Sequence, residues 1–333
     1  MKVGTIGTGV IVDMAIDSMK SVPGIEVDAA YSRTMDKANA FKEKHSMKRA
    51  YDSLDNLFAD PEIDTIYVAS PNALHYAQAK AALEAGKNVI LEKPFTPTEA
   101  EAKDLFETAE KNGVMIFEAI APIHTPNFGI LQEQLGAAGE IHNAILNYSQ
   151  LSSRYARYKE GDIANAFDPK MYGGALMDIN VYNIHLAASL FGDPDAVHYY
   201  PNIGDNGIDT SGTLIMEYPD LTVVCTGAKD SQSPDFSVIE GDEGTFVLDG
   251  GPNGRIPSVR FVTAPRHKRV ASQTFKDGEN AMIFEFMDFN MALNEKNKEA
   301  YENWKDETLS VVRILEEASK QRDAKAKASG KLD

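Results

Sequence analysis

The chain has 333 residues, 43% of them apolar, and its 50 acidic and 33 basic side chains give a net charge of −17. At about 150 residues per domain this length indicates two domains, and the apolar content excludes general disorder. An acidic surface repels phosphate backbones and anionic lipids, so we expect neither a nucleic-acid nor a membrane partner. The single cysteine, Cys225, cannot form an internal disulfide, which fits a cytoplasmic protein.

Neither end of the chain suggests a membrane segment. The apolar stretch 3–12 resembles a signal peptide only superficially, because Gly7 and Gly9 interrupt it and Asp13 follows closely. No run of about 18 apolar residues indicates a transmembrane helix. The segment 320–333 is rich in Lys, Ala and Asp, and we interpret it as a frayed tail.

Strand and helix patterns alternate over the first 120 residues. The predicted strands are 1–6, 26–31, 65–69, 88–91 and 114–117. The predicted helices are 10–20, 36–44, 73–85 and one that begins at a capping box of Thr96 and Glu99 and ends at Gly113. Strands separated by helices indicate βαβ units and a doubly wound parallel sheet, that is, a Rossmann-like α/β domain. Such sheets bind ligands outside the carboxyl ends of their strands.

The first predicted strand is followed by a glycine-rich turn, Gly7-Thr8-Gly9-Val10-Ile11-Val12. Gly7 permits a tight turn, and Gly9 lets a pyrophosphate approach the backbone at a helix N-terminus. Val12 stands where a third small residue is usual, which indicates a slightly wider separation of helix and strand. The alternative is an ordinary Gly-rich turn, but its position in the first βαβ unit favours a dinucleotide site at residues 7–11.

The second predicted strand ends at Ser32 and Arg33, with Lys37 one helical turn further on. A hydroxyl and two cations can hold a 2′-phosphate, so NADP is favoured. Asp28 has the spacing of a ribose-binding acid but lies within the strand. Asp36 lies close by and keeps NAD open, and Arg33 stacked on the adenine would tolerate either cofactor.

Two further strand ends carry candidate residues. Ser70-Pro71-Asn72 leads into a helix carrying His75, and these residues can reach the cofactor; the alternative is a capped helix with a surface histidine. Glu92-Lys93-Pro94 follows the fourth strand. A lysine there can polarise a substrate oxygen or carry its proton, and Pro94 allows an unusual peptide geometry. The alternative for Glu92 and Lys93 is a surface ion pair.

The rest of the chain, 121–333, forms the second predicted domain after the dinucleotide-binding domain 1–120. Short strand patterns occur at 141–148, 195–203, 211–218, 221–227, 236–240, 244–248 and 258–264. Without intervening helices they indicate a largely antiparallel sheet in an α+β domain. Helices are predicted at 282–297 and 304–319.

These motifs together resemble the glucose–fructose oxidoreductase / inositol dehydrogenase / MocA family. The matching features are the GxGxx turn, Ser32-Arg33, the SPNALH segment, Glu92-Lys93-Pro94 and the segment 173–185, GGALMDINVYNIH. Glu118-Ala119, Asp178 and Tyr182 are most similar to the dihydrodiol dehydrogenase-like branch, in which Tyr replaces His. The stretch 120–126 lacks that branch's Arg-Phe pair, and Asn180 replaces its usual Gly. Both departures bear on the substrate and not on the cofactor chemistry.

The resemblance implies hydride transfer between NADP or NAD and a secondary alcohol or carbonyl of a sugar, polyol or diol. It implies that Lys93 and Tyr182 are the proton-transfer pair and that Asp178 orients Lys93. A nearby ammonium favours the phenolate form of a tyrosine. Asp178, Tyr182 and His185 have the spacing of one helix face, which makes His185 a substrate contact, or alternatively a structural histidine. No HxxxH or CxxC spacing supports a metal site, so none is expected.

The resemblance also implies a second domain with an open-faced sheet and helices on one side. An open apolar face favours a homodimer or higher homo-oligomer. A dinucleotide-binding sensor without turnover is the alternative function. Such a protein has no need to keep the set Lys93, Asp178 and Tyr182.

Overall fold

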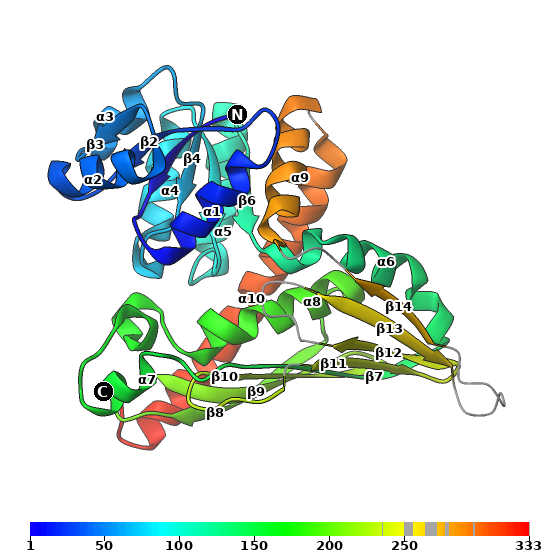
Figure 1. Ribbon diagram of the computed structural model, residues 1–333. Helices are drawn as coiled ribbons and strands as arrows, with labels where there is room; N and C mark the ends of the chain where they lie inside the picture. The colour runs from blue at the N-terminus through cyan, green and yellow to red at the C-terminus, as the bar shows by residue number, and fades with distance from the viewer. Residues whose placement is uncertain (235, 250–255, 264–271, 277–279, 296, 333) are drawn as a thin grey trace. The chain divides into compact units, whose positions relative to one another are not determined.

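The computed structural model describes residues 1–234, 236–249, 256–263, 272–276, 280–295 and 297–332. The chain forms two compact units (Figure 1). The first comprises Met1–Ala119 and Met282–Leu309, and the second comprises Ile120–Ala281 and Ser310–Asp333. The chain therefore leaves the first unit after Ala119, but it returns to that unit over 282–309, a segment that the sequence analysis assigned to the second domain.

The first unit contains a six-stranded sheet in the order β3-β2-β1-β4-β5-β6, and all its pairings are parallel. Its strands are β1 (Lys2–Ile6), β2 (Glu26–Tyr31), β3 (Arg49–Tyr51), β4 (Thr65–Val68), β5 (Asn88–Glu92) and β6 (Ile116–Ala119). This confirms the predicted doubly wound parallel sheet. The edge strand β3 was not predicted.

In the first segment of the first unit helices alternate with the strands, and two further helices come from its second segment. They are α1 (Val10–Lys20), α2 (Met35–His45), α3 (Leu54–Ala59), α4 (His75–Glu84), α5 (Glu99–Asn112), α9 (Met282–Glu295) and the first part of α10 (Lys298–Ala328). The predicted capping box of Thr96 and Glu99 is wrong. Thr98 caps α5 by accepting a hydrogen bond from the Glu101 amide at 3.3 Å, because the second of two overlapping Thr-x-x-Glu patterns has the extended cap conformation.

The core of the first unit explains why the segment 282–309 belongs to it. Phe289 stacks on Phe117 of β6 with ring centroids 4.7 Å apart, and Trp304 meets Phe117 edge-on at 6.2 Å. Phe286 meets Tyr67 of β4 edge-on at 6.1 Å. Burying an aromatic ring of this size stabilises a fold by about 1.5–3 kcal/mol, so α9 and the start of α10 complete the core that covers β4 and β6.

The second unit contains an eight-stranded sheet in the order β14-β13-β12-β11-β7-β10-β9-β8. Its strands are β7 (Ile141–Ser149), β8 (Ala196–Ile203), β9 (Asp209–Glu217), β10 (Thr222–Ala228), β11 (Phe236–Gly241), β12 (Gly244–Asp249), β13 (Ser258–Thr263) and β14 (Ser272–Lys276). The pairing of β7 with β10 is parallel and the other pairings are antiparallel. The helices are α6 (Pro126–Gln134), α7 (Tyr155–Lys159), α8 (Val181–Phe191) and the rest of α10.

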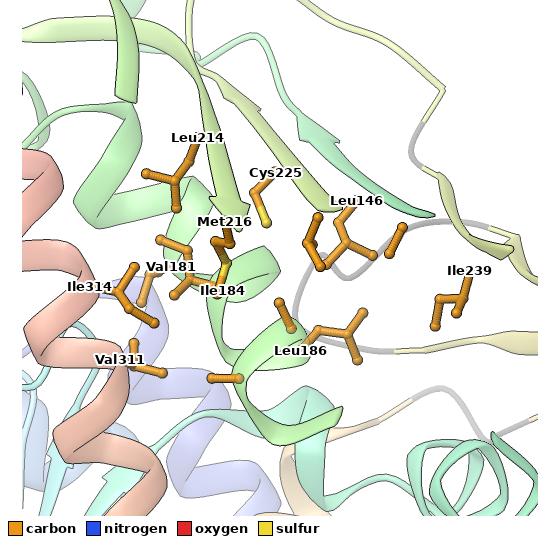
Figure 2. Close-up of a cluster of buried hydrophobic side chains, with 14 of the residues drawn as sticks. Leu146, Val181, Ile184, Leu186, Leu214, Met216, Cys225, Ile239, Val311 and Ile314 are labelled. Atoms are coloured by element: carbon orange, nitrogen blue, oxygen red, sulfur yellow. The ribbon is translucent and has the colours of Figure 1, made fainter. Parts of the chain in front are cut away.

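One face of this sheet packs against α8 and α10 (Figure 2). Leu146, Cys225 and Leu214 are cross-strand neighbours and point into this core. Ile184 of α8 and Ile314 of α10 pack onto them from the helical side. This confirms an α+β unit with helices on a sheet face.

The predicted frayed tail at 320–333 is wrong, because α10 continues through Ala328 and binds the edge strand β8. Gln321 accepts from the Tyr199 amide at 2.7 Å and donates to the Val197 carbonyl at 2.8 Å. Lys325 donates to the Pro201 carbonyl at 2.5 Å. Lys and Ala are good helix formers, and here they cover a strand edge that would otherwise be open. Within the described residues, neither α10 nor any other helix has the length and apolar character needed to cross a membrane.

Candidate active site

The turn between β1 and α1 leaves backbone accessible at the predicted pyrophosphate site. Gly7 has φ +120°, and a Cβ there would lie 2.5 Å from the Ala69 carbonyl oxygen. Gly9 is the N-cap of α1, provides no side-chain cap, and a Cβ on it would meet nothing within 4 Å. Thr8, Val10 and Ile11 are exposed. The N-terminus of α1 is therefore exposed and carries no side-chain cap, which is the arrangement that suits a phosphate.

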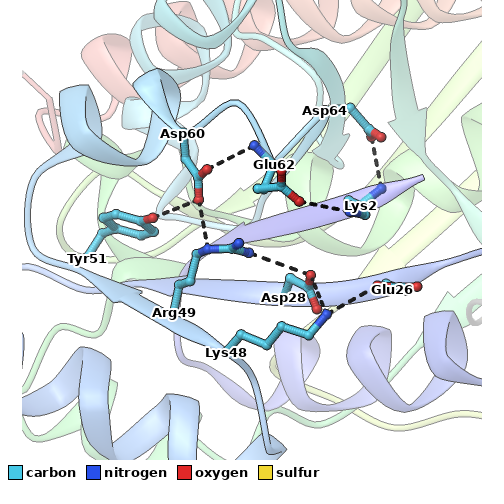
Figure 3. A network of polar contacts seen from close by, with 9 residues as sticks. All are labelled: Lys2, Glu26, Asp28, Lys48, Arg49, Tyr51, Asp60, Glu62 and Asp64. Atoms are coloured by element: carbon cyan, nitrogen blue, oxygen red, sulfur yellow. Dashed lines mark hydrogen bonds and ion pairs between the residues drawn. The ribbon is translucent and has the colours of Figure 1, made fainter.

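Two kinds of residue at the end of β2 are candidates for binding the ribose or its 2′-phosphate, namely an acid and a group with a hydroxyl and two cations. The structure places them differently. Arg33 and Lys37 are exposed, and Ser32 is half-buried with its amide donating to the Tyr51 carbonyl. Asp28 is buried, and its carboxylate lies 2.9 Å from Lys48 Nζ and 3.7 Å from Arg49 Nη1 (Figure 3). Asp28 is therefore committed to a network within the fold, while hydroxyl and cationic groups occupy the tip.

His75 lies between the turns that follow β4 and β5 and contacts both. Its side chain is buried, so the alternative of a surface histidine is wrong. Nδ1 lies 3.0 Å from the Pro94 carbonyl oxygen and Nε2 lies 2.9 Å from the Ser70 carbonyl oxygen. Burial lowers the pKa of His75. The imidazole thus joins the Ser70-Pro71-Asn72 turn to the Glu92-Lys93-Pro94 turn.

The turn after β5 is fixed from several sides. The Lys93–Pro94 peptide bond is cis, in line with the unusual geometry allowed for it. Glu92 is buried, accepts from the Tyr67 hydroxyl at 2.5 Å, and has its pKa raised by burial. The Phe95 amide donates to Glu118 Oε1 at 3.1 Å. Lys93 itself is half-buried and lies at the carboxyl edge of the sheet, in the same unit as the turn at Gly7.

In the second unit, the Gly173-Gly174 pair allows close packing before the segment that carries Asp178. A Cβ on Gly173 would lie 2.7 Å from the Asn165 carbonyl oxygen. Gly174 has φ +102°, and a Cβ there would lie 2.1 Å from Asp209 Oδ1. The buried Asp209 accepts a hydrogen bond from the Leu176 amide at 2.6 Å. Both glycines are therefore required by neighbours that hold this segment.

Asp178 and Tyr182 lie on different kinds of helix. Leu176–Asn180 is a π-helical turn, η6, which runs directly into α8 with Tyr182 and His185. Such turns are frequent at functional sites. Tyr182 is half-buried, with its ring 5.7 Å from that of Tyr148, whereas His185 is fully buried, which favours its structural alternative. In the described part of the chain, no group of three or more His, Cys, Asp and Glu side chains is placed to hold a metal ion.

Lys229, which directly follows β10, is a charged neighbour of Asp178 that was not predicted. Its Nζ lies 2.5 Å from Asp178 Oδ2 and donates to the Ala166 carbonyl at 2.8 Å. The signal that was available is a charged residue at the end of the apolar strand TVVCTGA, the same rule that identified Lys93.

Asn180, the departure from the usual glycine, is a buried anchor. Its Nδ2 donates to the Cys225 carbonyl at 3.1 Å, and its Oδ1 accepts from Asn183 at 2.7 Å. A Cβ on Gly227 would lie 2.8 Å from Asn180 Cβ. Asn180 therefore fastens the π-helical turn to β10.

Comparisons with known proteins agree with this architecture. Residues 1–120 match the family model "Oxidoreductase family, NAD-binding Rossmann fold", and residues 134–247 match "GFO/IDH/MocA C-terminal domain". The chain is 34% identical over 316 residues to scyllo-inositol 2-dehydrogenase (NADP(+)) IolU of Bacillus subtilis, covering 95% of each chain. It is 27% identical over 222 residues to trans-1,2-dihydrobenzene-1,2-diol dehydrogenase of Mus musculus, covering 65% of this chain and 64% of that one.

A solved structure shows the same fold. KijD10, a 3-ketoreductase from Actinomadura kijaniata in complex with NADP and TDP-benzene, superposes with a TM-score of 0.83 at 21% identity, over 96% of this chain and 97% of that one. With both of its units matched, the chain belongs to the GFO/IDH/MocA family of oxidoreductases.

Proposed function

We propose that the protein transfers a hydride between NADP and a secondary alcohol or carbonyl of a sugar, polyol or related diol. The observation that carries this proposal is Lys93, which an otherwise tightly bonded turn presents at the carboxyl edge of an NAD-binding Rossmann fold. The names of the relatives, an inositol dehydrogenase and a dihydrodiol dehydrogenase, support the substrate class.

The carboxyl edge of the first unit fits a dinucleotide. We infer that the amides at Gly9, Val10 and Ile11 hold the pyrophosphate, because the helix end is uncapped and open. Thr8 and Gly7 form the turn beside them. The residues proposed to line the nicotinamide half are Ser70, Pro71, Asn72, Glu92 and Lys93, with His75 supporting the two turns from below. When bound, the nicotinamide supplies or accepts the hydride.

We infer a preference for NADP over NAD. Arg33 presents a planar guanidinium that can hold a phosphate through two hydrogen bonds, and Ser32 and Lys37 add a hydroxyl and a second cation. The acid that would favour an unphosphorylated ribose, Asp28, is buried against Lys48. The printed name of IolU, an NADP(+) enzyme, agrees with this preference.

Lys93 and Tyr182 form the proposed proton-transfer pair. In the oxidative direction the Tyr182 side chain, as the phenolate, takes the proton of the substrate hydroxyl and becomes the neutral phenol. The Lys93 ammonium stabilises the phenolate beforehand and the negative charge that develops on the substrate oxygen. In the reductive direction the same groups return the proton. We propose that Asp178 balances the charge of Lys93 and orients its side chain. The bonds of Asn180 and Asp209 give the segment that bears Asp178 and Tyr182 a fixed position within the second unit.

The test is a panel of sugars, inositols and diols with NADP and NAD, followed through the absorbance of the reduced nicotinamide. With a substrate in hand, Lys93→Met and Tyr182→Phe should each lower kcat by about 10²–10⁴-fold, the usual contribution of general acid–base catalysis. Lys87→Met is a matched control, because this buried lysine donates to the Asp60 and Ile63 carbonyls, at 2.7 and 2.6 Å, and has no proposed role in the site. Wild-type turnover by the Lys93 variant would refute the proposed proton transfer. If the wild type converts no substrate of the panel, the proposed oxidoreductase activity is refuted.

We further propose a homodimer or higher homo-oligomer formed through the outer face of the second sheet. The strand registers place five apolar residues in one row across that face: Ile215, Val224, Ile145, Val238 and Val247. Ile145 at its centre is 40% exposed. A contiguous apolar row of this kind favours a second copy as its partner. Light scattering on wild type and Ile145→Asp tests this, and a monomeric wild type would contradict it.

We also infer a cytoplasmic location from the state of the cysteine. Cys225 is fully buried, burial raises the pKa of its thiol, and no second cysteine exists to pair with it. The fold therefore has no use for an oxidising compartment. Cell fractionation with an antibody to the chain tests the location, and recovery outside the cytoplasm would refute it.

A further inference from the structure

Lys229 is enclosed by three groups in the second unit. Its side chain is 2% exposed, and its ammonium contacts the Asp178 carboxylate, the Ala166 carbonyl and the face of Phe167, whose ring centroid is 4.7 Å away. Its main chain is held as well, because its amide donates to Thr210 and its carbonyl accepts from Ser152. The ammonium therefore has a fixed position at the end of β10.

The contacts of Lys229 close a ring of interactions around Asp178. The Ala166 carbonyl accepts both from Lys229 Nζ and from the Gly174 amide at 3.1 Å. The Gly174 carbonyl in turn accepts from the Asp178 amide at 3.1 Å, and the Asp178 carboxylate returns to Lys229. Lys229 thus connects the loop at 165–167, the turn at Gly174 and the carboxylate in one circuit.

The burial of the two partners is unequal, and this indicates what the pair is for. Lys229 is enclosed, whereas the Asp178 side chain is 36% exposed. Buried ion pairs can often be replaced by apolar side chains without loss of stability, so a fold needing only packing here has no need of a charge. A fixed cation behind a partly exposed carboxylate, however, keeps that carboxylate ionised and in one orientation.

We propose that Lys229 is a positioning residue of the active site. It keeps the Asp178 carboxylate ionised and in one orientation, and it connects the 165–167 loop to this carboxylate. This inference rests on the role proposed above for Asp178. Lys229 acts through Asp178, because its own ammonium is enclosed by protein.

The experiment compares Lys229→Met with Lys229→Gln, and uses Lys87→Met as the control for losing a buried lysine. Misplacing a catalytic group by a small distance can cost about 100-fold in rate, so Lys229→Met should lower kcat/KM by about this factor and leave the dissociation constant for NADP unchanged. Without the cation, the acidic limb of the pH profile of kcat/KM should move to higher pH. Lys229→Gln retains a hydrogen-bond donor for the Ala166 carbonyl and is included in case Lys229→Met does not fold. The acidic limb of its pH profile should move in the same way.

A double variant separates positioning from general damage. If Lys229 acts through Asp178, adding Lys229→Met to Asp178→Asn should cause little further loss of kcat/KM, because coupled residues are not additive. Full additivity, or a wild-type pH profile in both Lys229 variants, would overturn the proposal. If the wild type and Lys87→Met turn over and the Lys229 variants match them, this inference alone fails. If the wild type converts no substrate, the proposed function fails, and this role of Lys229 is refuted with it.

Discussion

Replacing Arg322 by Met tests whether the end of α10 is part of the fold. Arg322 is buried, and its Nη1 lies 3.7 Å from Oδ1 of the fully buried Asp209. Asp209 also accepts from the Tyr199 hydroxyl at 2.7 Å and from the Leu176 amide at 2.6 Å. Methionine keeps an apolar stem but removes the cation, which leaves the carboxylate buried without its charge partner.

The burial of the pair determines how much the substitution should lower Tm. Removing one partner of a buried ion pair costs about 3–5 kcal/mol. For a unit of roughly 150–250 residues, each kcal/mol lowers Tm by about 2–4 °C, so the expected decrease is roughly 6–20 °C. Arg313→Met on the same helix is the control, because its pair with Asp193 has both side chains at least half exposed and contributes about 0–1 kcal/mol.

The pH dependence supplies a second readout. Burial raises the pKa of Asp209, and Arg322 acts in the opposite direction. A carboxyl whose pKa is raised on folding stabilises the fold at acidic pH and loses this contribution as the pH rises through the folded value. Without Arg322 that pKa rises further, so the Tm deficit of the variant should be largest near neutral pH and shrink toward about pH 5. A deficit no larger than that of Arg313→Met, measured by calorimetry, would refute the reasoning.

Three further predictions concern the first unit. Arg33→Ala should raise the KM for NADP by about 10–100-fold and leave the KM for NAD unchanged, because hydrogen bonds to charged groups contribute about 1.5–3 kcal/mol. Steady-state kinetics with both cofactors measures the two KM values, and equal effects on them would contradict a 2′-phosphate site. Burial lowers the pKa of His75, so its contribution to stability is present above about pH 6.5 and lost as the pH falls below it. Tm measured across this range should therefore depend less on pH in His75→Gln, and an unchanged pH dependence would exclude the buried neutral imidazole. Phe289→Ala should cost about 3–5 kcal/mol, seen in denaturant unfolding; a loss below about 1 kcal/mol would argue against α9 as core of the first unit.

The parallel sheet of the first unit could be predicted because each central strand is an apolar run covered on both faces and followed by turn residues. Strand β3 could not, since Arg49–Tyr51 is too short to carry a periodic pattern. It is held by pairing with β2 and by the bonds of Lys48 and Arg49 to Asp28, all of which are tertiary. The prediction for the tail was wrong for the same reason: its composition suggests fraying, whereas its order depends on tertiary bonds, such as those that Gln321 and Lys325 donate to carbonyls of β8.

The candidate site shows a similar division. Lys93, Ser32 and Arg33 could be proposed from the sequence because the strand-end rule applies directly to a βαβ pattern. Asp178 and Tyr182 depended on the family resemblance, and their place on a π-helical turn and α8 depends on long-range bonds such as that of Asn180 to Cys225. No periodicity in the sequence encodes those bonds.

The return of the chain to the first unit has a consequence for synthesis. About 160 residues separate its two segments, and at a translation rate of about 5–20 residues per second they take roughly 8–30 s to make. During that interval Tyr67 and Phe117 lack the rings of Phe286 and Phe289 that cover them. The segment 1–119 must therefore wait, with apolar surface exposed, until the segment 282–309 has emerged. A fragment ending at residue 120 would remain permanently in that state.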